Sequence, residues 1–188
     1  MLVRSAFDPP EIGANGEMVG TLICDEDEIV EKKTVTGIAY SKDEAQITLR
    51  RLEDKPGVAA SVFGPLAEAG INVDMIVQNV SEDGSTTDLT FTVPIAEYDR
   101  AASVLEEVRA AIGYQAMQGT PEVAKVSVIG IGMRSHAGVA SEAFNALAAC
   151  GINIHAITTS EIKISILIDT SFTELAVRTL HSLYGLDN

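Results

Sequence analysis

One stretch of this sequence occurs twice, and the repeat limits the fold more than any other feature. The segment from Pro56 to Val73 reappears 81 positions later, from Ala137 to Ile154. The matched pairs are Gly57 and Gly138, Phe63 and Phe144, Leu66 and Leu147, Gly70 and Gly151, and Asn72 and Asn153. This spacing is too long for a solenoid unit and corresponds to a whole small α/β domain. We therefore expect two copies of one module.

Composition and charge exclude several functional classes. The chain has 188 residues, 46% of them hydrophobic, which suits one or two small domains with a packed core. Its 13 basic and 27 acidic residues give a net charge of −14, which argues against binding to nucleic acid or an anionic membrane surface. Cys24 and Cys150 are isolated, as in a reducing cytoplasm, and no apolar stretch approaches the ~20 residues that span a bilayer. We expect a soluble, cytoplasmic chain without metal or cofactor.

Residues 1–33 are expected to form a tail or linker. Asp8-Pro9-Pro10 and the segment Gly13–Gly16 interrupt any periodicity, and Met1–Pro10 has no signal-peptide pattern. The acidic run Asp25–Glu28 is interpreted as a solvated charged face and not as a cation site, because no spaced set of further acceptors accompanies it.

From residue 34 onward the pattern of apolar residues becomes regular. Alternation predicts strands, and a spacing of three to four residues predicts helices. In the first copy we expect strands at 34–40 and 45–52, a helix at 58–69, strands at 71–80 and 87–93, and a helix at 97–112. In the second copy we expect a strand at 124–131, a helix at 138–150, strands at 152–159 and 163–169, and a helix at 173–184.

These elements predict an α+β fold of two βαββαβ modules. The second copy has no strand after its last helix, so a strand from elsewhere should complete its sheet. Residues 34–41 are the available candidate. The expected domains are a first module at 42–120, inserted into a second module made of 34–41 and 121–188.

The loop before the first repeated helix is a candidate ligand site. It reads Asp54-Lys55-Pro56-Gly57-Val58-Ala59, and Gly57 allows a ligand to approach the backbone closely. The amides that follow and the positive end of the helix dipole suit a carboxylate, while Asp54 suits an ammonium group. An ordinary Pro-Gly turn remains an equally good interpretation of the spacing.

Polar side chains fall beside this loop in the expected fold. Asn72, Gln78 and Asn79 follow the first repeated helix, and Asn153, Ser160 and Glu161 occupy the corresponding part of the second copy. Carboxamides offer both donors and acceptors, which a zwitterion requires. The same residues would also fit a hydrated sheet face.

The sequence contains no familiar catalytic motif. There is no Walker loop, no GxSxG elbow and no HExxH pair. Gly130-Ile131-Gly132 follows a strand, but Gly138 is too far away for a dinucleotide-binding turn. His136 is the one histidine placed for a site role, and an exposed loop histidine is the simpler interpretation. We expect no catalytic residue and no metal ligand.

Several motifs together resemble the paired ACT modules in the regulatory region of aspartate kinase. They are Val35–Ser41, Asp54–Gly57, Ile71–Met75, Gln78–Ser81, Gly132–His136 and Ser160–Ser165. Within the tail, Val3–Phe7 and Gly20–Ile23 resemble the end of the family's kinase domain. The resemblance implies ferredoxin-like ACT modules, and the family's kinase start and nucleotide pocket have no counterpart in this sequence.

The resemblance also implies partners and a site. A chain of this kind would be the β subunit that pairs with a catalytic α subunit, or an excised piece of a longer kinase, and would form a homodimer through its ACT modules. Its effectors would be threonine and, in many members, lysine, bound between the modules of two chains. The implied effector-binding residues are Asp54, Gly57, Val58, Ala59, Gln78 and Asn79 from the first module and Asn153, Ile154, Ser160 and Glu161 from the second. Ala137 and Gly151 depart from the family pattern, so the second module's own pocket is not implied.

Two other functions remain open at this stage. The chain would also suit a stand-alone amino-acid sensor or the regulatory subunit of another enzyme, because ACT-like pairs occur with many partners. A catalytic ferredoxin-like enzyme would require acid–base or metal-binding residues that the sequence does not provide.

Overall fold

The structure, a computed structural model, describes residues 2–3, 21–22, 34–82, 84–130 and 138–186. It divides into two compact units, Met1–Lys33 and Thr34–Asn188. In the first unit the short strands β1 (Leu2–Val3) and β2 (Thr21–Leu22) pair antiparallel. The remainder of the expected tail, including the acidic run, lies outside the described residues.

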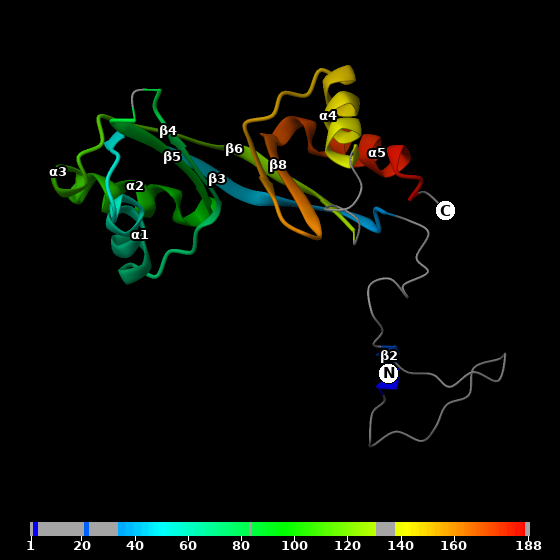
Figure 1. The fold of residues 1–188 in the computed structure, drawn as a ribbon, viewed down its shortest axis with the longest axis horizontal. Coiled ribbons are helices and arrows are strands. Elements are labelled where there is room, and N and C mark those ends of the chain that lie inside the picture. The colour runs from blue at the N-terminus through cyan, green and yellow to red at the C-terminus, as the bar shows by residue number, and fades with distance from the viewer. Residues whose placement is uncertain (1, 4–20, 23–33, 83, 131–137, 187–188) are drawn as a thin grey trace. The chain divides into compact units, whose positions relative to one another are not determined.

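The second unit contains one six-stranded antiparallel sheet in the order β4-β5-β3-β6-β8-β7, with helices packed on it (Figure 1). The elements in chain order are β3 (Gly37–Glu53), α1 (Val58–Glu68), β4 (Asp74–Val80), β5 (Thr86–Val93), the 3₁₀ turn η2 (Ile95–Glu97), α2 (Tyr98–Glu107), α3 (Arg109–Ile112), β6 (Ala116–Ile129), α4 (Val139–Ala149), β7 (Ala156–Thr159), β8 (Lys163–Asp169), the 3₁₀ turn η3 (Thr170–Phe172) and α5 (Thr173–Leu183).

Strands β3 and β6 belong to both halves of the sheet. The second half of β3 pairs with β5 and with the first half of β6, which gives the first module the order β4-β5-β3-β6. The first half of β3 pairs with the second half of β6, which gives the second module the order β3-β6-β8-β7. Both orders are those of a ferredoxin-like sheet. The expected pair of ferredoxin-like modules is confirmed, with the second completed by a strand from before the first.

The structure differs from the sequence prediction at the point where the modules join. Strands expected at 34–40 and 45–52 form the single strand β3, and β6 extends back to Ala116, well before the expected start at residue 124. The polar run between the expected strands looked like a break. It stays in the strand because the register shifts between Ser41 and Gln46, where Asp43 Oδ1 accepts a hydrogen bond from the Ile95 amide at 3.0 Å. The domain limits at 41/42 and 120/121 stay predictions.

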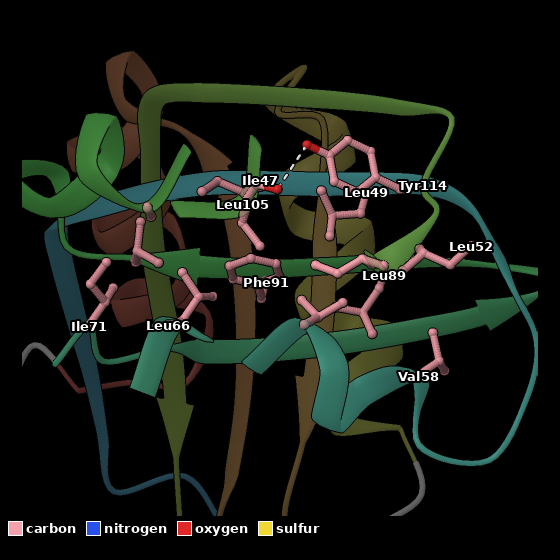
Figure 2. Packing of buried hydrophobic residues seen from close by; sticks show 14 of the residues in the cluster. Ile47, Leu49, Leu52, Val58, Leu66, Ile71, Leu89, Phe91, Leu105 and Tyr114 are labelled. Carbon is pink, nitrogen blue, oxygen red and sulfur yellow. Dashed lines mark hydrogen bonds between the residues drawn. The ribbon is translucent and has the colours of Figure 1, made fainter. Parts of the chain in front are cut away.

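The first module buries its core between the sheet and helices α1 and α2. On α1 the buried residues are Val58, Val62 and Leu66, one per turn of a single face. They pack on alternate residues of β3 and β5, and Figure 2 shows Phe91 at the centre of this cluster. The ring of Phe63 meets that of Phe91 edge to face at a centroid distance of 5.2 Å, an arrangement worth about 0.5–1.5 kcal/mol beyond burial.

The second module repeats this packing with α4 and α5. Its buried residues on α4 are Val139, Ala143 and Leu147, at the same spacing as on α1. They pack on alternate residues of β6 and β8, such as Val126 and Ile166. The internal repeat of the sequence is therefore a repeat of helix-on-sheet packing.

Close packing beside β6 generates a prediction about Gly130. A Cβ atom placed on Gly130 would overlap the backbone oxygen of Thr34, whereas one placed on Gly37 would meet nothing within 4 Å. We expect Gly130→Ala to lower the free energy of unfolding by about 1–3 kcal/mol, because backbone cannot yield as a flexible side chain does. Gly37→Ala, the matched control, should change it by less than about 1 kcal/mol. Urea denaturation of both variants measures the difference, and equal values would contradict the packing.

Candidate functional site

The loop before α1 has the geometry of an anion-binding turn. Gly57 has a φ of 93°, a left-handed conformation that favours glycine, and no side chain caps the start of the helix. The Val58 amide donates to a loop carbonyl at 3.2 Å and the Ser61 amide donates to the Gly57 carbonyl at 2.9 Å. The amides of residues 59 and 60, which lie between them, have no acceptor within the helix. Amides at this position suit a carboxylate.

Gln78 and Asn79 lie at the same end of the first module as this loop. Val80, the next residue along β4, pairs with Thr87 of β5, and Thr87 also pairs with Leu52 near the end of β3. The loop begins just beyond Leu52. Gln78 and Asn79 are both exposed on an outer strand of the sheet. The structure therefore brings the first predicted set of residues to one end of the module.

The second predicted set lies along β7, the other outer strand. Asn153 and Ile154 precede β7, and Ser160 and Glu161 follow it. Ile154 packs partly against the second core, while the other three are exposed. The Ser160 amide donates to the carbonyl of Lys163 at 2.8 Å, which closes the turn between β7 and β8.

The two sets lie on or beside the two outer strands of the sheet, β4 and β7. Ala156, at the start of β7, packs against the apolar cluster of Met75, Val123 and Leu167, and Met75 lies near the start of β4. Gln78 and Asn79 lie three and four residues farther along β4, roughly 10–13 Å away at the usual rise of a strand. The motif Gly132–His136 and Ala137, which precede the second repeated helix, lie outside the described residues.

Three charged side chains meet on the face of the sheet opposite the helices. Val126 points into the second core, so its neighbour Lys125 points to the opposite face. Lys125 Nζ lies 2.6 Å from Glu44 Oε1 of β3 and 2.7 Å from Asp74 Oδ2 at the start of β4. The side chains of Lys125 and Glu44 are 19% and 7% exposed, and that of Asp74 is 59% exposed. Lys125 of β6 thus forms ion pairs with a residue of β3 and with a residue of β4.

This cluster shifts the pKa of two of its members. Burial by itself raises the pKa of Asp74, but hydrogen bonds from Lys125 and the Met75 amide, and the positive charges of Lys125 and Lys163, outweigh it and lower the pKa. Burial by itself lowers the pKa of Lys125, but its hydrogen bonds to Asp74 and Glu44, and their negative charges, outweigh it and raise the pKa. Both groups stay charged across the neutral range.

Met75 connects the same region by apolar contact. Its side chain is 3% exposed and packs with Val123 of β6, Leu167 of β8 and Ala156 of β7. Its backbone has a φ of 47°, an uncommon value for a residue with a side chain, and its amide donates to Asp74 Oδ1 at 2.8 Å. The start of β4 is therefore held on the second module by charge and by packing together.

Sequence reasoning did not single out Glu44, Asp74 or Lys125 as interacting residues. A signal was present, because Lys125 is the only charge among the apolar residues that β6 buries between Val123 and Val128. A lysine at such a position requires partners of opposite charge. Its partners come from strands far away in the sequence, so their identity depends on the fold.

The described residues offer little for other chemistry. Among them, no group of three or more His, Cys, Asp and Glu side chains is placed to hold a metal ion. No helix in the described part of the chain is long and apolar enough to cross a membrane. What the site offers is a turn whose amides suit a carboxylate, at the same end of the module as two exposed carboxamides.

Comparison with known families matches both modules. The model of the ACT domain matches residues 47–113, and a second ACT-domain model matches residues 126–184. These two ranges correspond to the two halves of the sheet described above.

Comparison with individual proteins gives longer matches. An aspartate kinase of Pseudomonas fluorescens is 53% identical over 169 residues, which are 89% of this chain and 41% of that protein. A crystal structure of aspartokinase alpha and beta subunits includes a chain with 49% identity and a TM-score of 0.75, matched over 80% of this chain and 99% of that one. The ligand-free regulatory subunit of aspartate kinase from Thermus thermophilus has 43% identity and a TM-score of 0.75, over 81% of this chain and 99% of that one. This chain spans about two fifths of the curated relative's length.

The charge cluster predicts how stability changes with pH. Because the pKa of Asp74 is lowered by folding, its contribution is present above the unfolded pKa of about 3.9 and is lost as pH falls through the lower folded pKa. We expect Asp74→Asn to reduce the free energy of unfolding by about 0.5–1 kcal/mol near pH 7, and the two proteins to converge below about pH 4. Urea denaturation across this pH range measures the difference. A gap that stays constant down to acid pH would show that the carboxylate charge is not responsible.

Proposed function

The chain belongs to the aspartate kinase family and consists largely of that family's ACT-domain regulatory region, and on this premise we propose that it binds feedback effector amino acids and controls the phosphorylation of aspartate by a catalytic domain or subunit. The effectors are threonine, alone or with lysine. The regulated activity and a cytoplasmic location are part of the same proposal.

The observation that carries this proposal is the arrangement of polar groups at one end of the first module. The uncapped amides of α1 and the exposed carboxamides of Gln78 and Asn79 lie at one end of the sheet. An amino acid has a carboxylate for the helix amides and an ammonium group for an acid such as Asp54. The proposed site residues from this module are Asp54, Gly57, Val58, Ala59, Gln78 and Asn79.

We further propose that two chains complete the site. Asn153, Ile154, Ser160 and Glu161 flank β7, which is at the other end of the strand order from β4 and Gln78. Both outer strands carry exposed apolar side chains: Ile76 and Val80 on β4 are 48% and 55% exposed, and Ile157 on β7 is 40% exposed. An unpaired strand of this kind is normally covered. Pairing of two chains would cover these edges and set the second group of residues against the first.

A catalytic subunit is the remaining proposed partner. The aspartokinase structure with a chain 49% identical to this one contains alpha and beta subunits. By that likeness, a separate regulatory chain would act on a catalytic chain, and effector binding would favour one arrangement of the assembly. Coupling of about 1–3 kcal/mol per site is typical of such control.

Titration of the purified chain with amino acids tests the proposal directly. We expect saturable binding of threonine by isothermal titration calorimetry, with a rise in oligomer mass measured in parallel by light scattering. Lysine added alone and together with threonine shows whether feedback is joint. No heat with either amino acid, with or without a catalytic subunit, would favour an amino-acid sensor of another specificity.

A substitution in β4 tests the assignment of the site. We expect Gln78→Ala to raise the Kd for threonine roughly ten- to hundredfold, because a hydrogen bond to a charged ligand group contributes about 1.5–3 kcal/mol. The strand should remain folded, since the side chain is exposed. Gln115→Ala removes another exposed glutamine of the first module and serves as the matched control. Equal affinities in the two variants would exclude Gln78 from the site.

A further inference from the structure

Strand β4 has two ends with different surroundings. Its last residues, Gln78 to Val80, lie at the proposed effector site, whereas its first residues, Asp74 and Met75, contact the second module. The strand is only seven residues long and lies at the edge of the sheet. It is therefore an element of the first module that reaches both the proposed site and the other module.

The contact at the start of β4 is a matched set of opposite charges. Lys125 carries one positive charge between two carboxylates, and the more buried of these, Glu44, is already a cross-strand neighbour of β6. Asp74 is the more exposed carboxylate and the one that β4 provides. Removing the charge of Asp74 would leave the Lys125–Glu44 pair intact. The link to β4 can thus be weakened without leaving a buried charge unpaired.

The register of β4 indicates that this contact sets the position of the strand. The pairing of β4 with β5 is continuous from Val77 to Val80 but shifts between Asp74 and Val77. The shift coincides with the positive φ of Met75, whose side chain is held among Val123, Leu167 and Ala156. The strand departs from regular pairing where it contacts the second module. Such local strain persists only where surrounding contacts over-determine it.

We propose that Asp74, Lys125 and Met75 form a latch that positions β4 and couples the proposed effector site to the second module. This inference rests on the proposed function for the identity of the ligand. Asp74 and Lys125 are positioning residues: they act on the effector through the backbone of β4. When the contacts of Asp74, Lys125 and Met75 are formed, β4 holds Gln78 and Asn79 in one orientation. When these contacts break, that orientation is no longer fixed.

The latch and a purely stabilising ion pair predict different effects of substitution on threonine affinity and on the opening of β4 and β7. A local ion pair that only adds stability would leave the effector affinity unchanged once the protein is folded. A latch that positions β4 would change the affinity for threonine and the local opening of β4 and of β7 together, because both strands meet at Met75 and Ala156.

The experiment compares Asp74→Asn with Glu174→Gln in the full chain. The side chain of Glu174 on α5 is 93% exposed, and its Oε1 lies 3.6 Å from Nζ of Lys42 on β3. Its substitution therefore also removes one carboxylate charge from an ion pair, far along the sequence from β4. Threonine affinity is measured by calorimetry at a temperature at which both variants are fully folded. Amide hydrogen exchange is followed in peptides covering 74–80 and 156–159, with 98–107 of α2 as the internal reference.

We expect Asp74→Asn to weaken threonine binding about fivefold or more, the lower end of usual coupling, and Glu174→Gln to leave it unchanged. Exchange should rise in both the 74–80 and the 156–159 peptides and stay constant in 98–107, because the amides of a helix are bonded within the helix. Lys125→Met should weaken binding as well, and the double variant with Asp74→Asn should be no weaker than Lys125→Met alone, because the two residues act through one contact.

The outcomes separate the latch from the proposed function. If the unchanged chain binds threonine and Asp74→Asn binds it equally well, the latch is refuted and the function stands. If the unchanged chain binds neither threonine nor lysine, the effector assignment fails. Exchange then decides the structural claim: joint exposure of 74–80 and 156–159 supports the latch, and a change confined to 74–80, or none, overturns it.

Discussion

Strands β3 and β6 are hydrogen-bonded from the pair Gly37 and Ile129 at one end to Arg50 and Ala116 at the other. Every other strand of the large sheet is attached to this pair, two on each side. Each module therefore takes two of its four strands from backbone that continues into the other module. No linker separates the modules in the described residues between Gly37 and Glu53 or between Ala116 and Ile129, so their relation is set by strand pairing. Helix packing and loop positions follow from that pairing.

Much of this fold could be predicted from local pattern. Helix α1 at Val58–Glu68 follows from an apolar residue on every turn and from Gly70, whose φ of 71° ends the helix. The long strand β3 could not be predicted in this way, because the polar residues before Ala45 are typical of a break between two strands. Its place in β3 depends on partners from β6 and η2. The helix expected at 97–112 is also divided, since the backbone at Val108 leaves the helical conformation. These are tertiary effects that no short window of sequence contains.

The candidate site, too, could be predicted only in part. A glycine after a proline and before a regular apolar pattern indicates a turn that leads into a helix, and the structure has one at Gly57. Which side chains stand beside that turn depends on strand order, and strand order placed Gln78 and Asn79 there. The partners of Lys125 depend further on a register shift in β3 and on the entry of β4. The chemistry of single residues was therefore readable from the sequence, and their combinations were not.

The order of synthesis gives the shared strands a further consequence. Gly37 leaves the ribosome 92 residues before Ile129, its partner in the sheet. At usual translation rates of about 5–20 residues per second, roughly 5–20 s pass before that partner exists. During this interval β3, β4 and β5 of the first module can pair with one another, while the segment from Gly37 to Ser41 remains an unpaired, largely apolar edge. A nascent chain of this protein is thus exposed to wrong strand pairing at one defined place and for a defined time.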